Sequence, residues 1–328
     1  MKKVLVGILL ALLFLVTGCK DKLLSNNTIE SVTKYLSSLD SYELKGDMTI
    51  HRENKDVNIN VTVSYLNPNY YKVCFNNQNG NEQLIVKNDD GVFVLTPSLN
   101  KEFKFDSEWP LNSSHAYLLS GLANDIKSDS ASTFSLDGDT AIISSNLSNK
   151  NDGATNLKLY FNVKNNNPEK AILLDDNGNE KVVMKFTDFT PNKSLSKDMF
   201  NTKLIMDEKN STKESTEGNN DEQTSSIAIT AGYVCDGAVL ESNVVNGDLT
   251  VLCYSGEKNY TIVVNKATVY PASVAIDEYL ELDFIESGLL LIGSNLARFF
   301  INGIEVSIYT NDLTTEEVLA IASDITII

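Results

Sequence analysis

The stretch VNINVTVSY, residues 57–65, alternates without a break between apolar and polar side chains. In a β-strand, successive side chains point to opposite faces, so the apolar residues would share one face. These residues are Val57, Ile59, Val61, Val63 and Tyr65. A strand with one buried and one wet face is typical of an antiparallel sheet, and the rest of the chain has to supply its partners.

The other regular stretches are mostly short strand candidates. They lie at residues 70–75, 82–87, 91–96, 101–105, 140–145, 156–163, 169–174 and 181–187, with turn signals such as Asn79-Gly80 and Asn177-Gly178 between them. Two stretches have helical spacing, one from Ile29 to Leu39, with Asn27 and Glu30 flanking its start, and one at 114–126. This pattern predicts a mainly β (α+β) fold, in which one large antiparallel sheet has two helices to cover it.

Residues 207–226 have the sequence DEKNSTKESTEGNNDEQTSS, which contains no aliphatic or aromatic side chain. This composition predicts a disordered linker. The linker would separate a larger domain, 28–206, from a smaller β-rich domain, 227–328. Strand candidates of the smaller domain lie at 227–234, 248–254, 259–265, 288–292, 297–301 and 304–309. Its last helix is marked by a capping box of Thr314 and Glu317, with Leu313 and Val318 at the positions of a hydrophobic staple.

The N-terminus has the layout of a secretory signal. Two lysines precede an uncharged run from Val4 to Gly18, which at about 1.5 Å per residue would span only about 22 Å as a helix, short for a membrane span. Leu15 and Val16-Thr17-Gly18-Cys19 resemble a bacterial lipobox. We therefore expect residues 1–18 to be removed, Cys19 to be acylated and 19–27 to form a tether, which places the protein on the extracytoplasmic face of the cell membrane. The alternative is a spanning helix that ends at Cys19.

The chain is strongly acidic, with a formal net charge of −17. Removal of residues 1–18 takes away two lysines and no acid, which leaves −19. Such a charge argues against nucleic acid as a partner and against lying flat on anionic lipid.

Few residues suit catalysis or metal binding. Cys235 and Cys253 could pair across two strands. The two histidines, His51 and His115, are expected at the surface, and no HExxH or paired CxxC motif occurs, so we expect no metal, no cofactor and no enzyme. The calcium-loop-like run at 175–180 has its glycine at the wrong position and is better explained as a hairpin turn.

The order of the elements resembles the LolA-like (outer-membrane lipoprotein-carrier) family. The resemblance rests on NPNYYKV (67–73, with Pro68), DDGVFVLTPSLNKEFKF (89–105, with Gly91 and Pro97) and DFTPNKSLSKDMF (188–200). Residues 104–126, with Trp109 and Pro110, are more similar to the Gram-positive, spore-former branch, which includes the clostridial germination lipoprotein. The smaller domain is similar to the one that follows in RseB/MucB-type proteins, through Tyr254-Ser255-Gly256 and the ending NDLTTEEVLAIASDI (311–325).

The resemblance implies an unclosed antiparallel half-barrel, lidded by helices, whose concave side Val57, Ile59, Val61, Val63 and Tyr65 would line. Asn67 stands where the carriers place an arginine, and a tethered protein cannot diffuse as a shuttle. We therefore expect a non-enzymatic binding module that supports a partner protein at the cell envelope, for which the germination branch implies a cell-wall (cortex) amidase. The alternative is a binder or sensor of a lipid or lipoprotein. Exposed edge strands would also allow a homodimer.

Overall fold

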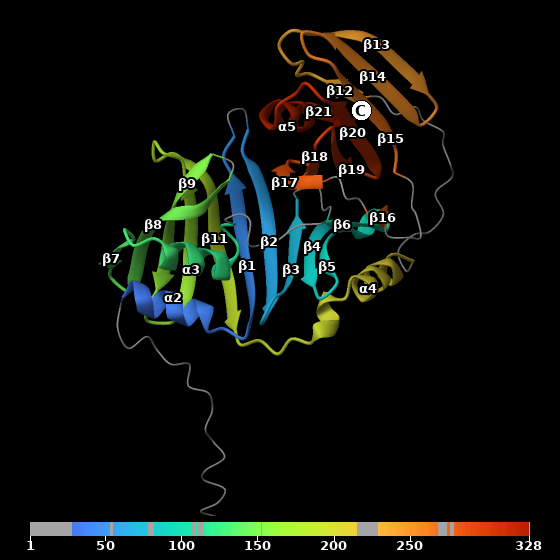
Figure 1. Ribbon diagram of the computed structural model, residues 1–328. Helices are drawn as coiled ribbons and strands as arrows, with labels where there is room; N and C mark the ends of the chain where they lie inside the picture. Colours follow the sequence, from blue (N-terminus) through green and yellow to red (C-terminus); the bar gives the residue numbers. More distant parts are fainter. Residues whose placement is uncertain are drawn as a thin grey trace, which may run out of the picture.

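The computed structural model describes residues 28–52, 55–77, 82–105, 109, 115–151, 153–214, 229–267, 274–275 and 279–327. These residues form two large open sheets and a separate two-stranded pair. The largest sheet has twelve strands in the order β16-β6-β5-β4-β3-β2-β1-β11-β10-β9-β8-β7 (Figure 1). All of its pairs are antiparallel except that of the two-residue β16 with β6. The strands are β1 Ser41–Ile50, β2 Val57–Leu66, β3 Tyr70–Asn76, β4 Glu82–Asn88, β5 Gly91–Thr96, β6 Lys101–Phe105, β7 Thr133–Asp137, β8 Thr140–Asn151, β9 Ala154–Asn162, β10 Asn167–Leu174, β11 Glu180–Pro191 and β16 Val274–Ala275.

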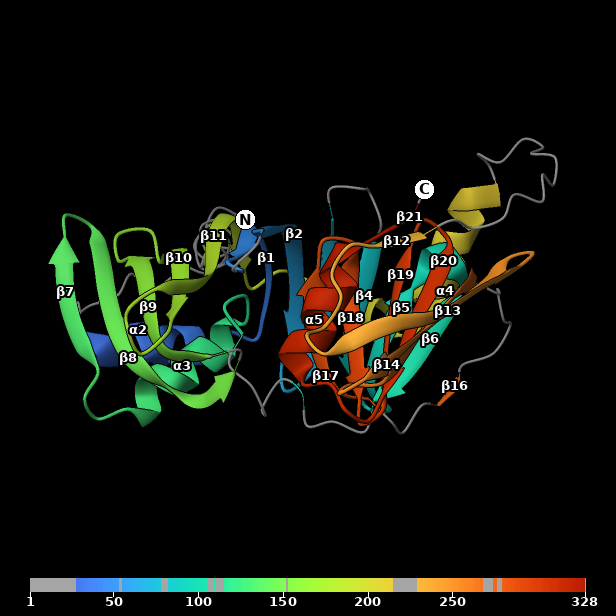
Figure 2. The same ribbon diagram turned by 90° about the horizontal axis from the view of Figure 1, so that it is seen from above.

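One face of the large sheet carries most of the hydrophobic core, and we call it the inner face. Helices α2 (Ile29–Ser37) and α3 (Leu119–Ser128) pack on it beside β8, β9 and β1 (Figures 1 and 2). Each helix buries an apolar stripe that includes Val32 and Leu36 from α2, and Leu122 and Ile126 from α3. This half of the sheet is thus covered by helices, as the sequence predicted.

The second sheet has seven strands in the order β13-β14-β15-β20-β19-β18-β17. They are β13 Ala238–Asn246, β14 Leu249–Gly256, β15 Tyr260–Lys266, β17 Tyr279–Ile285, β18 Gly288–Gly293, β19 Leu296–Ile301 and β20 Ile304–Thr310. Helix α5 (Thr315–Asp324) and the short pair β12 (Ile229–Ala231) and β21 (Ile325–Ile327) complete a core of their own on one face of this sheet.

The other face of the second sheet packs on the inner face of the first, over β2 to β6 (Figure 2). Ring pairs join the two sheets, with centroids 4.8 Å apart for Phe75 and Phe284 and 5.8 Å apart for Phe103 and Phe300. Leu289 and Leu291 belong to the same hydrophobic cluster as Val61 on β2. The two halves of the chain therefore share one core.

The outer face of the large sheet is covered at β3 to β5 by η2 (Lys197–Phe200) and α4 (Thr202–Glu214). Phe200, Ile205 and Met206 are buried there. The predicted disordered linker therefore begins too early, because residues 207–214 continue α4, whose start is anchored by these apolar residues. Residues 215–228 lie outside the described part of the chain.

The mainly β fold with helices covering an open antiparallel sheet is confirmed. Strands β1, β7, β13, β16, β17 and β21 were not predicted, and the predicted strand at 227–234 is reduced to the three residues of β12. The second helix begins at Leu119 rather than 114. Thr314 and Glu317 form the predicted capping box, whereas the first helix is capped by Thr28 with Ser31, one residue after the predicted Asn27.

Candidate functional site

The five residues predicted to line a concave side all lie on the inner face. Val57, Ile59, Val61, Val63 and Tyr65 are buried in the shared core, and Val63 has no exposed surface at all. They are covered by the chain's own helices and by the second sheet. Their role as ligand-lining residues stays a prediction, but the side chains that cover them are those of this protein.

An aromatic cluster lies where the helices meet the second sheet. Tyr71 stacks near Tyr65, with ring centroids 4.8 Å apart, and meets the edge of Trp109 at 5.7 Å. Its hydroxyl forms a 2.8 Å hydrogen bond with Ser120 of α3, and burial raises its pKa to about 12. This cluster packs the predicted motif residue Trp109 into the core, with only 4% of its surface exposed.

His115 belongs to the same cluster and is not the solvated histidine that the sequence predicted. Its ring stacks on Tyr117 at 5.1 Å and lies 6.0 Å from Trp109. Because burial disfavours the charged imidazolium, the pKa of His115 falls to about 4. His51 is different, since it lies at the surface and its Nδ1 is 3.0 Å from the carboxylate of Asp56. The two histidines thus have different surroundings, a surface carboxylate for His51 and an aromatic cluster for His115.

Buried amide side chains join the two sheets. The Oε1 atom of Gln83 accepts a hydrogen bond of 2.6 Å from the backbone N–H of Leu289, and its Nε2 donates to Thr96 Oγ1 at 3.3 Å. Asn77 donates to the carbonyl of Ser287 at 2.6 Å. These contacts satisfy polar groups of β4 and of the turn before β18 that the packing removes from water. They fix how the second sheet lies on the first.

Charged side chains also cross between the sheets. Glu305 of β20 forms ion pairs with Lys101 of β6 and, at 2.9 Å, with Arg298 Nε. All three side chains are largely buried. Arg52 pairs with Asp283, whose side chain is 6% exposed. Since a charge left unpaired in such a place is costly, these pairs favour one docked arrangement of the sheets.

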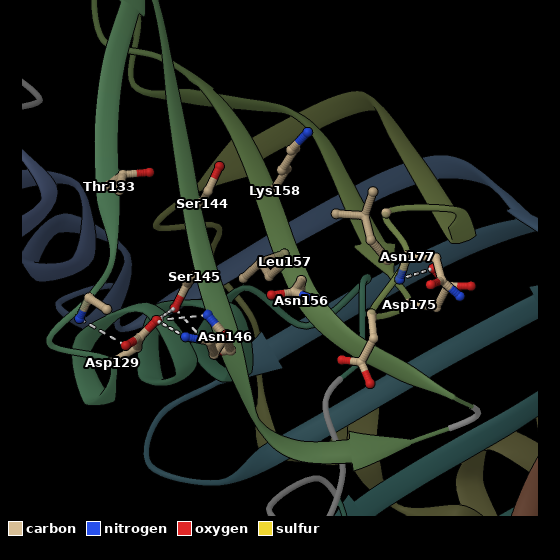
Figure 3. Close-up of a pocket in the computed structure, with 14 residues that line it drawn as sticks. Asp129, Thr133, Ser144, Ser145, Asn146, Asn156, Leu157, Lys158, Asp175 and Asn177 are labelled. Carbon is tan, nitrogen blue, oxygen red and sulfur yellow. Dashed lines mark hydrogen bonds between the residues drawn. The ribbon is translucent and has the colours of Figure 1, made fainter.

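A polar groove with a volume of about 440 Å³ lies at the other end of the large sheet (Figure 3). Strands β7 to β10 and the loops at Asp129 and Asp175 form its walls. Its lining is mostly Asn, Asp, Ser and Thr, with Lys158 and two leucines. This lining differs from the apolar surface that a lipid chain requires.

Two of the three loop carboxylates of the groove, those of Asp129 and Asp175, accept local hydrogen bonds. Asp129 accepts hydrogen bonds from the backbone N–H groups of Asn146 and Ala131. These bonds lower the pKa of Asp129, and the bond from Asn146 has the largest effect. Asp175 accepts from Asn179 and Asn177, which likewise lowers its pKa and makes the run at 175–180 the hairpin turn between β10 and β11. An acid held in its charged form is poorly suited to donate a proton at neutral pH.

The remaining motif residues occupy turns. Pro68 follows a cis peptide bond between β2 and β3, and Pro97 begins the short helix η1 (Pro97–Leu99). Gly91 adopts φ +136° in the turn from β4 to β5, a conformation that side-chain-bearing residues rarely adopt. Pro110 and Cys19 lie outside the described residues.

Cys235 and Cys253, whose pairing the sequence left open, are both free thiols in the structure. Cys235 lies in the core beside α5, where its thiol donates to Glu317 at 3.1 Å. Cys253 stands between Leu252 and Tyr254, which point into that core, so its own side chain points to the opposite face of β14. The two sulfur atoms are therefore separated by the sheet.

An exposed apolar strand that the sequence pattern did not predict lies at the free edge of the second sheet. We call this surface the β13 edge, and it consists of Val239, Leu240, Val244 and Val245 on β13 with Leu249 on β14. These side chains are 40% to 69% exposed. The segment AVLESNVVN lacks alternation, but the flanking Asp236-Gly237 and Asn246-Gly247 turn signals could have revealed it.

Neither a metal-ligand group nor a membrane-spanning helix is present in the described residues. They contain no group of three or more His, Cys, Asp and Glu side chains placed to hold a metal ion. Among the same residues, no helix is both long and apolar enough to cross a membrane.

Comparisons with known proteins identify the family. A family model described as "Sporulation protein YdcC-like" matches residues 1–200. The sporulation protein YdcC of Bacillus subtilis (strain 168) is 26% identical over 328 residues, which cover 97% of this chain and 94% of that protein.

Three solved structures are similar at low identity. A chain from the Pseudomonas aeruginosa MucA/MucB complex is 12% identical (TM-score 0.31), with 90% of this chain and 95% of that chain covered. A LolA superfamily protein from Nitrosomonas europaea is 12% identical (TM-score 0.32; 54% and 98% covered). A chain from the structure of the CwlD amidase of Clostridioides difficile in complex with the GerS lipoprotein is 18% identical (TM-score 0.30; 49% and 92% covered).

The family model spans more than half of the chain. The chain therefore belongs to the YdcC-like family of sporulation proteins.

Proposed function

We propose that this protein is a membrane-anchored lipoprotein of the extracytoplasmic face that binds and supports a partner protein during sporulation, without catalysing a reaction itself. The observation that carries the proposal is the filled inner face of the large sheet. Where a lipid binder needs an open apolar hollow, this face is occupied by α2, α3 and the second sheet. The sporulation setting comes from the family, and the anchor from the lipobox at Cys19.

The partner class follows from the resemblance of residues 104–126 to the clostridial germination lipoprotein, which points to a cell-wall (cortex) amidase. A rigid platform suits such a role, because a preformed surface loses little conformational freedom when a partner docks. The buried contacts of Gln83, Asn77 and Glu305 between the two sheets supply that rigidity.

The first test is native mass spectrometry of residues 20–328, secreted from a Gram-positive host and purified without detergent. We expect the spectrum to show the mass of the protein without any bound ligand. An adduct of lipid mass that survives purification would instead support the alternative, a binder or sensor of a lipid or lipoprotein.

The second test is direct binding to purified cortex amidases of the same host, measured by co-purification from a tagged, tethered protein. A stable complex that raises amidase activity or solubility is the expected result. Failure to bind any of these wall hydrolases would contradict the proposed partner class.

A further inference from the structure

The β13 edge lies at the outermost strand of the second sheet, on the side away from the large sheet (Figure 1). Strand β13 pairs with β14 along one side only, from Ala238 opposite Gly256 to Asn246 opposite Leu249. The backbone groups on its other side have no strand partner in the described part of the chain. Such an edge is a template for one more strand.

The usual protection of an edge strand is confined to the middle of β13, where the charged Glu241 lies in a bulge between Leu240 and Ser242. Val239 and Leu240 are neighbours, as are Val244 and Val245, and neighbouring residues on a strand point to opposite faces. Both faces of β13 are therefore apolar and exposed, with Val239 at 69% and Val245 at 52%. Natural edge strands are usually shortened or charged instead.

The opposite edge of the molecule shows the usual protection. Strand β7 has five residues, of which Thr133, Ser135 and Asp137 are polar and exposed. Its large exposed apolar side chain is Leu136, at 46%. The apolar character of β13 is thus a local feature and not a general property of the edges of this protein.

The charges around the β13 edge favour a basic occupant. Asp236, Glu241 and Asp248 are exposed on β13 or in the turns that flank it. The Lys258 ammonium is held by Glu317, which leaves Lys266 at the end of β15 as an exposed cation nearby. A second copy of this chain, with its formal charge of −17, would bring like charge to the same place.

We propose that the β13 edge is the docking site for an extended, basic segment of the partner protein, which adds to the second sheet as an eighth strand beside β13. Valine and leucine side chains of the edge would contact alternate apolar residues of that segment, and its Lys or Arg residues would face the flanking acids. The proposal rests on the proposed function, since it names the surface through which a partner would bind. An interface of one strand is small, so we expect an affinity of about 10 µM for an isolated segment.

The test uses residues 20–328 and fluorescein-labelled peptides of about nine residues, the length of β13. One peptide alternates valine with lysine, a second alternates valine with glutamate, and a third carries a central proline in the lysine sequence. Fluorescence anisotropy measures binding to the unmodified chain, to Val239→Lys/Val245→Lys and to the matched control Leu136→Lys. Circular dichroism verifies that each variant is folded.

We expect the valine–lysine peptide to bind and the other two peptides to bind at least tenfold more weakly. The double variant should lose at least tenfold in affinity, while Leu136→Lys should change it less than twofold. Absence of binding, equal binding of the glutamate peptide, or equal losses in the control would overturn the proposal. So would sedimentation data that show a dimer of the unmodified chain and a monomer of the double variant, because the occupant would then be a second copy.

The outcome is separable from that of the proposed function. If the double variant still forms the amidase complex with unchanged affinity, the partner binds elsewhere and this inference fails while the proposed function stands. If the unmodified chain carries a lipid and binds no wall hydrolase, the proposed function fails whatever the peptides do.

Discussion

The half-buried position of His115 in the aromatic cluster predicts a specific dependence of stability on pH. Replacement of His115 by phenylalanine keeps an aromatic ring between Trp109 and Tyr117 and removes the group that titrates. The His51→Gln variant is the matched control, because it removes the other histidine, which lies at the surface beside Asp56, and leaves His115 in place. The carboxyl groups of the chain titrate in all three proteins, so the comparison isolates the contribution of the His115 ring to the pH dependence of stability.

The magnitude follows from the difference in proton uptake. The pKa of His115 is about 4 in the folded protein against 6.5 for an ordinary histidine. As the pH falls below 6.5, His115 becomes protonated in the unfolded chain but stays neutral in the folded chain until about pH 4. The stability that the neutral ring contributes is therefore fully present above pH 6.5 and is lost as the pH falls. At about 1.36 kcal/mol per pKa unit the full difference would be about 3 kcal/mol, and partial exposure of the ring reduces it to about 2 kcal/mol.

The assay is urea unfolding of the three proteins at pH 7 and pH 4.5, with the free energy of unfolding extrapolated to water. Between these pH values the unmodified protein and His51→Gln should each lose about 2 kcal/mol more than His115→Phe. If all three lose the same free energy within about 0.5 kcal/mol, His115 is not buried as described and the reasoning is wrong.

Two further substitutions test the packing. Gln83→Leu should lower the free energy of unfolding by about 1–3 kcal/mol, because it leaves the buried N–H of Leu289 without an acceptor. Unchanged stability in urea would show that this hydrogen bond does not hold the second sheet on the first. Thr314→Ala should cost about 1 kcal/mol by removing the cap of α5, and Thr28→Ala, which removes the same kind of cap from α2, gives the matched comparison by thermal unfolding.

Local patterns predicted the parts of the fold that depend on neighbouring residues. The alternation at 57–65 matches β2, because one face of that strand is buried along most of its length. The capping box at Thr314 depends on residues three apart and was found directly. The hairpin at 175–180 was recognised for the same reason, since Asp175 bonds to residues within the turn.

Features that depend on distant residues were not predictable in this way. The two rings beside His115, Trp109 and Tyr117, are its neighbours in the sequence. They enclose it because they pack in turn on Tyr71 and Phe75 of β3, which lie far away in the sequence. The contact of Gln83 with Leu289 joins residues 206 positions apart. Strand β13 was missed because its apolar residues are adjacent rather than alternating, and this adjacency is what leaves both of its faces apolar.

The docking of the second sheet on β2 to β6 has a consequence for how the chain is made. Synthesis proceeds from the N-terminus, so Phe75 and Phe103 are produced long before Phe284 and Phe300, the rings that cover them. Until the last strands emerge, this part of the inner face stays uncovered and able to aggregate. A chain that ends before β17 would therefore keep the strand pairing of the large sheet but expose the apolar side chains that the second sheet covers. Synthesis of the last strands is thus the step that removes this aggregation-prone surface from water.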